Sequence, residues 1–136
     1  MKEEDALLWI GRAAGARSCQ RGERIQSLWG GYGELFRVHL TGAKQPSAVV
    51  KWVRPPALPR GREADVSHGR KLRSYEVELA FYRRFAPRCD AACRVPALLE
   101  GLRAPDEWLF VLEDLDAAGF AGRRRAPSPA EIERCL

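Results

Sequence analysis

The chain has no apolar run that approaches the length of a membrane-spanning helix. Its first residues, Met1 to Asp5, are acidic where a secretory signal would be basic. We therefore expect a cytoplasmic protein that does not bind a membrane.

Metal ligands are also scarce. The two histidines are isolated, and Cys89 and Cys93 are the only close pair among the four cysteines. A structural zinc site takes four ligands, which two close pairs usually supply. We expect reduced cytosolic thiols rather than a metal centre.

The composition is otherwise that of one folded domain. Of the 136 residues, 46% are hydrophobic and 30% are charged. The net charge of +5 favours anionic partners, although it does not separate nucleotides from nucleic acids.

Residues 47–53 predict a strand, because β-branched and aromatic residues dominate them and turn residues precede them. Side chains alternate along a strand, so Lys51 shares a face with Val49 and Val53. An ammonium on an apolar face is costly unless it reaches water or a partner. Two interpretations stay open: an edge-strand lysine that extends to solvent, and a lysine placed to bind phosphate.

Three glycines lie in the turn at residues 30–33, before a half-buried strand predicted over residues 34–40. Glycines let a backbone approach a ligand closely and present its N–H groups to an anion. The alternative is an ordinary hairpin tip. The spacing to Lys51 favours the phosphate interpretation.

Residues 74–85 predict the main helix, which proline ends at position 87. Glu78 lies at helical spacings from four aromatic residues, which are Tyr75, Phe81, Tyr82 and Phe85. A carboxylate on such a face needs a partner, and Lys51 is the obvious one. The alternative is that Glu78 lies at the rim and pairs with a nearby arginine.

Between the lysine strand and this helix, residues 54–73 hold three prolines, two glycines, six basic residues and two acidic residues. This composition predicts an irregular, solvated connection. An anion-binding loop is the alternative, but no further spacing supports it.

The remaining patterns predict a helix over residues 5–15 and strands over residues 25–29, 97–103 and 108–113. Short connections make the strands antiparallel neighbours. Ser128, Pro129 and Glu131 form a capping box that begins a further helix. Its apolar stripe starts at Ile132, Cys135 and Leu136. We expect this helix to continue in a larger protein or to be completed by a partner.

This order of elements resembles the small lobe of the protein-kinase-like fold. The residues resemble the choline kinase and aminoglycoside phosphotransferase superfamily, and within it the ecdysteroid-kinase-like group. The stretches that carry the resemblance are residues 28–38, 49–51, 70–82 and 110–115. The implied fold is α+β, with an antiparallel sheet of about five strands and one principal packed helix. The implied function is binding of ATP and transfer of its γ-phosphoryl group to a hydroxyl of a small molecule.

The resemblance assigns the phosphate end of the nucleotide to four residues. Lys51 would hold the α- and β-phosphates, and Glu78 would pair with it. Gly31 and Gly33 would line the loop over the phosphates. We therefore expect Gly33→Val to impair nucleotide binding more than folding.

The resemblance also assigns the adenine end. Val38 and Val49 would cover one face of the ring. Backbone groups of Glu113 and Leu115 would hydrogen-bond its edge where the chain leaves the sheet.

No HxD-type catalytic loop is present in the sequence, and in this superfamily the large lobe supplies the catalytic aspartate and the Mg²⁺ ligands. We therefore expect a helical segment over residues 1–20, a small lobe over residues 21–116, and a linker with the start of a large-lobe helix over residues 117–136. The large lobe itself would be absent from this chain. The alternatives are a non-catalytic nucleotide-binding or regulatory module of the same fold and a basic nucleic-acid-binding domain, although aromatic residues at core spacings count against the latter.

Overall fold

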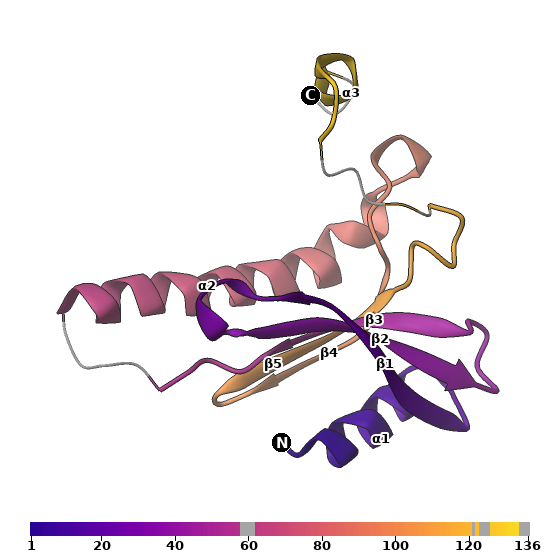
Figure 1. Cartoon of the computed structure of the whole chain (residues 1–136), viewed down its shortest axis with the longest axis horizontal. Helices are drawn as coiled ribbons and strands as arrows, with labels where there is room; N and C mark the ends of the chain where they lie inside the picture. The colour runs from indigo at the N-terminus through magenta and orange to yellow at the C-terminus, as the bar shows by residue number, and fades with distance from the viewer. Residues whose placement is uncertain (58–61, 121, 123–125, 134–136) are drawn as a thin grey trace.

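The computed structural model describes residues 1–57, 62–120, 122 and 126–133, which form one antiparallel sheet between two helices (Figure 1). Its strands are β1 (Ser18–Ser27), β2 (Gly33–Thr41), β3 (Ser47–Val53), β4 (Leu98–Ala104) and β5 (Glu107–Glu113). They lie in the order β1-β2-β3-β5-β4. The predicted α+β fold with five antiparallel strands and one principal helix is confirmed. It is consistent with a kinase-like small lobe.

The pairing register decides which side chains share a face. Lys51 of β3 lies opposite Leu35 of β2 and Phe110 of β5. One step along the same face, Val49 lies between Arg37 and Leu112. These two cross-strand rows form the floor of the region described below.

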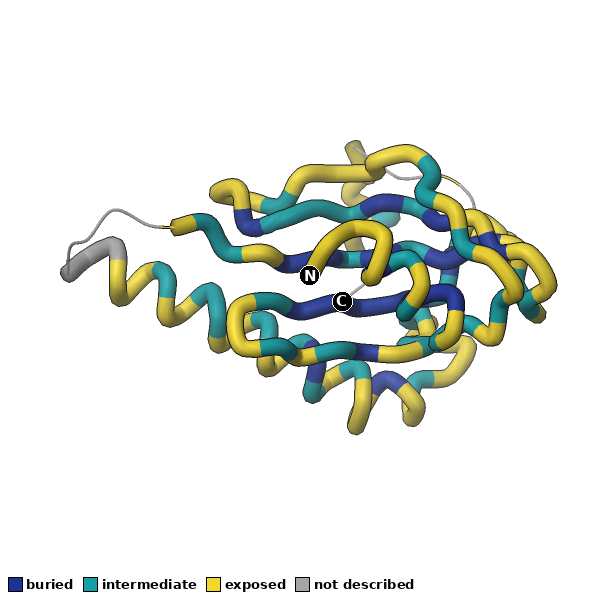
Figure 2. The backbone as a smooth tube through the Cα atoms, turned by 90° about the horizontal axis from the view of Figure 1, so that it is seen from below, coloured by how far each residue is buried: buried dark blue, intermediate teal, exposed yellow. Residues whose placement is uncertain are grey.

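The larger buried cluster lies on the opposite face, under helix α1 (Glu3–Ala13). Ala6 and Ile10 of α1 are fully buried there. The sheet contributes alternate residues of its central strands to this cluster: Phe36, Val38, Leu40, Ala48, Val50, Trp52, Leu109 and Val111. Figure 2 shows buried segments concentrated in these central strands, with exposed turns around them. Burial of each large apolar side chain of this cluster, such as that of Ile10, contributes about 1.5–3 kcal/mol, so α1 belongs to the same folding unit.

Strand β1 starts earlier than predicted. It begins at Ser18 rather than residue 25, and it ends at Ser27. The strand is an edge strand whose last five residues are all exposed, and it is irregular between Arg21 and Gln26. The backbone of β1 pairs with β2, but its side chains are mostly polar and lack the apolar alternation that marks a half-buried strand. The sheet therefore starts before the lobe boundary expected at residue 21.

Helix α2 (Arg62–Arg84) is much longer than the predicted helix at residues 74–85. The prediction of an irregular connection up to residue 73 was wrong from Arg62 onward. The prolines, which suggested the loop, all precede Arg62, and Gly69 lies within the helix. A single glycine costs only about 1 kcal/mol in a helix. The predicted loop residues 58–61 lie outside the described residues.

The side chains of α2 that meet the sheet differ in part from the predicted aromatic face. Leu72, Tyr75, Leu79 and Tyr82 pack against the cluster formed with Val53, Trp108, Phe110 and Leu112. Phe81 and Phe85, in contrast, are exposed and stack on each other. Helical spacings of three and four residues fit both the sheet-facing set and the exposed set, so the sequence pattern could not select between them.

The capping box at the start of helix α3 (Pro129–Glu133) is confirmed. The Ser128 N–H donates to Glu131 Oε2 at 2.9 Å, and the Glu131 N–H donates to Ser128 Oγ at 3.4 Å. Cys135 and Leu136, which were expected to continue the apolar stripe, lie outside the described residues. In the part of the chain that the structure describes, no helix combines the length and hydropathy needed to cross a bilayer.

Candidate functional site

Strand β3 and helix α2 bring the predicted lysine and glutamate together. Lys51 Nζ donates to Glu78 Oε2 at 2.5 Å. Both side chains are largely withdrawn from solvent, with exposures of 15% for Lys51 and 30% for Glu78. The predicted ion pair is therefore present. Since β3 lies between β2 and β5, Lys51 is not an edge-strand lysine.

Aromatic rings enclose this ion pair. Lys51 Nζ lies 5.0 Å from the centre of the Tyr75 ring and 5.6 Å from that of Phe110. Burial, together with the charge of Glu78, raises the pKa of both Tyr75 and Tyr82 above the ordinary tyrosine value. Both tyrosines therefore stay neutral at physiological pH. The ion pair lies in a weakly solvated setting, where electrostatic interactions are stronger than in water.

A pocket of about 610 Å³ lies on the same face of the sheet. Its floor contains Leu35, Val49 and Leu112, and Ile25 and Tyr82 also line it. The lining is mainly apolar, and the volume is in the range of small-molecule sites. Leu35 lies directly opposite Lys51 and Val49 is two residues along the strand, so the pocket extends from the row of the lysine towards the end of β5.

The segment that leaves β5 borders this pocket with residues 113–116. The Glu113 N–H already donates to the Ala97 carbonyl at 2.8 Å, which leaves only the Glu113 carbonyl for the predicted adenine contact. The Leu115 carbonyl accepts from the Phe120 N–H at 2.8 Å. No acceptor for the Leu115 N–H occurs among the described residues, so this donor can serve a ligand.

The side chain of Glu113 has a separate, structural role. Its carboxylate accepts from Arg94 at 2.6 Å and from the Ala97 N–H at 3.0 Å. These hydrogen bonds hold the pKa of Glu113 below its ordinary value, with the Arg94 bond as the larger cause. Glu113 therefore fixes the start of β4 to the end of β5, beside the pocket.

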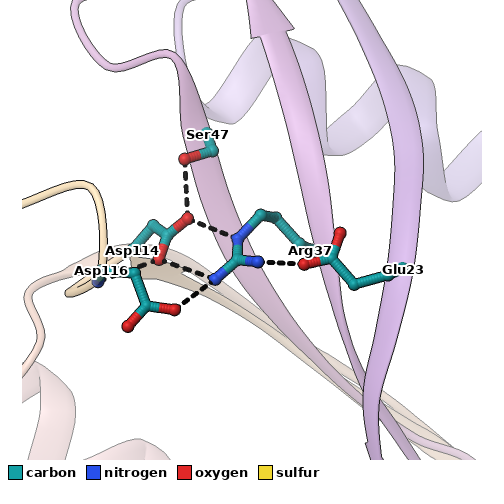
Figure 3. Close-up of polar contacts among 5 residues, drawn as sticks. All are labelled: Glu23, Arg37, Ser47, Asp114 and Asp116. Atoms are coloured by element: carbon teal, nitrogen blue, oxygen red, sulfur yellow. Dashed lines mark hydrogen bonds and ion pairs between the residues drawn. The ribbon is translucent and has the colours of Figure 1, made fainter. Parts of the chain in front are cut away.

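A polar network, which sequence reasoning missed, borders the pocket (Figure 3). Arg37 Nε donates to Asp114 Oδ2 at 2.7 Å, and its Nη2 donates to Asp116 at 2.6 Å. Glu23 of β1 also pairs with this guanidinium. Ser47 Oγ donates to Asp114 Oδ2 at 2.7 Å. One arginine thus connects β1 and β2 to the segment that leaves the sheet.

The carboxylate of Asp114 is ionised although it is almost completely buried. Burial alone would raise its pKa, but the hydrogen bonds from Arg37 and Ser47 and the arginine charge outweigh burial. The pKa of Asp114 therefore lies below its ordinary value. The same pairing, led by the hydrogen bond to Asp114, raises the pKa of Arg37. Arg37 alternates with apolar residues in β2, so its spacing alone suggested only a solvent-facing position.

Val38 does not reach the pocket. It is fully buried in the cluster under α1, on the other face of the sheet. The predicted contact of Val38 with an adenine is therefore wrong for this pocket, because alternation along β2 points Leu35 and Arg37 to the pocket instead. Val49, the other residue expected to cover the adenine, lies in the pocket floor. The register between β2 and β3, which places Leu35 opposite Lys51, identifies Leu35 as the pocket residue of β2.

The glycine turn packs close to the end of β3. A Cβ on Gly33 would lie 2.0 Å from the Trp52 carbonyl oxygen, and Gly33 has a φ of 132°. Gly33 is therefore required by the backbone of the sheet itself. Gly31 has a φ of 74°, and a Cβ there would meet nothing within 4 Å, so its Cα faces open space. Of the two predicted loop glycines, only Gly31 borders space that a ligand can enter.

Within the described residues, no group of three or more His, Cys, Asp and Glu side chains is arranged to hold a metal ion. Comparison with family models, with curated proteins and with solved structures finds no significant match to the chain.

Proposed function

We propose that this chain binds ATP on the face of the sheet that carries α2, as the small lobe of a small-molecule kinase. The observation that carries the proposal is the Lys51–Glu78 ion pair beside a mainly apolar pocket at the end of β5. A strand lysine aimed by a helix glutamate is the phosphate-binding device of kinases.

The pocket supplies what an adenine ring requires. Leu35, Val49 and Leu112 give an apolar surface on which a flat base can lie. The Leu115 N–H and the Glu113 carbonyl offer one donor and one acceptor at its edge. The adenine would then lie one cross-strand row from Lys51, whose ammonium would contact the α- and β-phosphates.

The proposed reaction transfers the γ-phosphoryl group to a hydroxyl of a small molecule. The hydroxyl oxygen bonds to the γ-phosphorus, the bond to the bridging oxygen breaks, ADP leaves, and a base takes the hydroxyl proton. Sterol, choline-like and aminoglycoside alcohols are the proposed acceptor classes. The described residues do not fit a Mg²⁺ site, so we assign no step to the metal and expect its ligands, like the catalytic base, in a large lobe. We place the protein in the cytoplasm, where ATP is abundant and thiols such as those of Cys19 and Cys89 stay reduced.

Isothermal titration with ATP tests the proposal. We expect Lys51→Ala to weaken ATP binding at least about tenfold, because one charge-assisted contact to phosphate is lost. Lys44→Ala is the matched control, since Lys44 is exposed on the turn after β2. Circular dichroism would confirm that both variants fold. Absence of ATP binding by the wild type, or equal affinities for all three proteins, would contradict the proposal.

A further inference from the structure

The unexpected first half of α2 carries a second lysine to the glycine turn. Lys71 Nζ lies 4.4 Å from the centre of the Tyr32 ring. It is also only 2.8 Å from the position that a Cβ on Gly30 would occupy. The ammonium therefore lies against the backbone of the turn instead of extending into solvent.

Lys71 differs from Lys51 in having no carboxylate partner within the part of the chain that the structure describes. None of the ion pairs among the described residues includes its ammonium, although Lys71 is half-buried. The Lys71 ammonium contacts the π face of Tyr32 instead. An aromatic face attracts a cation but carries no negative charge that could neutralise it. Such a position suits an anionic ligand that supplies the missing charge.

The turn is held firmly against the helix at this point. Tyr32 is only 2% exposed, and its hydroxyl is hydrogen-bonded to His68 Nδ1 at 2.7 Å. The Arg54 N–H donates to the Tyr32 carbonyl at 2.8 Å. The turn and Lys71 therefore keep their relative positions without a ligand, which lowers the entropic cost of binding one.

Lys71 lies in line with the site already described. It precedes Glu78 by two helical turns on the same face of α2, about 10 Å along the helix axis. Along the sheet, the order is the pocket at Val49, then Lys51, then the row of Gly33 and Val53, and then Tyr32. A ligand that extends from the pocket past Lys51 therefore ends at the glycine turn and Lys71.

We infer that Lys71 is a second phosphate-binding residue, which contacts the terminal phosphates of a nucleoside triphosphate. The nucleoside part of this inference rests on the proposed function, whereas the anion site rests on the geometry of the turn alone. Lys71 would make the site selective for triphosphates over monophosphates.

Titrations with ATP, AMP and inorganic tripolyphosphate test this inference on the full chain. The proteins are the wild type, Lys71→Ala, Lys71→Arg and Lys51→Ala. The control is Arg73→Ala, which removes the same charge from an exposed position two residues along the helix. Thermal unfolding of each variant would separate lost contacts from lost structure.

We expect Lys71→Ala to weaken binding of ATP and of tripolyphosphate roughly tenfold, the value of one charge-assisted hydrogen bond. Binding of AMP should change less than about twofold, Lys71→Arg should retain most of the affinity, and Arg73→Ala should behave like the wild type.

Unchanged ATP affinity in Lys71→Ala, or an equal loss for ATP and AMP, would overturn the inference while the effect of Lys51→Ala still supports the nucleotide site. Binding of tripolyphosphate without ATP, weakened by Lys71→Ala, would support the anion site and refute the proposed function. Binding of neither ligand would refute both.

Discussion

Substitution of Gly33 by alanine should damage the sheet more than the ligand site. The added Cβ would lie 2.0 Å from the Trp52 carbonyl oxygen, whereas ordinary contacts begin at 3.4 Å. Backbone atoms cannot rotate away as a side chain can, so β2 must separate from β3 near the Gly33–Val53 pair. The strained φ costs about 1–2 kcal/mol, and a backbone shift in a packed region costs about 1–3 kcal/mol more. This reverses the expectation from sequence that Gly33→Val would affect binding more than folding.

Thermal unfolding followed by circular dichroism measures this effect. A loss of about 3 kcal/mol should lower Tm by roughly 10 °C in a domain of this size. Gly31→Ala is the control, because its φ of 74° is also positive but its Cβ would meet nothing. We expect its Tm to fall by only about 4 °C. A Gly33→Ala protein as stable as the Gly31→Ala protein would refute this reasoning.

Three further predictions concern charged groups and catalysis. In urea unfolding, Lys51→Ala and Glu78→Ala should each cost about 1–3 kcal/mol, and the double variant should cost less than their sum; additive losses would show that the ion pair contributes nothing. Because the pKa of Asp114 is lowered on folding, its contribution should be present above about pH 4 and lost as the pH falls further. Unfolding measured from pH 6 to pH 3 should therefore show a steeper loss for the wild type than for Asp114→Asn, and parallel curves would count against this assignment. The chain alone should transfer no phosphate from labelled ATP to sterol, choline-like or aminoglycoside acceptors, and transfer abolished by Lys51→Ala would show that catalytic groups are present in it.

The site residues that could be predicted from the sequence are charged residues on otherwise apolar faces. Lys51 in an apolar strand and Glu78 in an aromatic helix each required a partner, and the structure pairs them. Strand β3 was predicted with the bounds that the structure shows, because β-branched residues and a preceding turn define it.

The features that were missed depend on information that local patterns do not carry. Strand β1 is polar because it lies at an edge, so no apolar alternation marks it. The first half of α2 has few apolar residues, since only one side of it meets the turn. Val38 was placed on the wrong face because an apolar strand face does not reveal which layer it meets. Only the register between β2 and β3 shows that Leu35, not Val38, shares a face with Lys51.

The network around Arg37 could not be foreseen for a similar reason. Its partners Asp114 and Asp116 lie far away in sequence, and only the position of β5 next to β3 brings them close. The position of Lys71 could not be predicted either. Its contact with the turn at Gly30 depends on the full length of α2 and on the packing of Tyr32 against this helix.

Mapping of amide chemical shifts with a non-hydrolysable ATP analogue tests the central claim most directly. A ligand in the proposed site should shift the amide signals of Leu35, Val49, Lys51 and Leu115. Signals of α1, such as that of Ile10, should not move, because α1 lies on the other face of the sheet. Saturable shifts confined to the first set would support the account. Shifts centred on α1, or no saturable shifts at millimolar analogue, would contradict it.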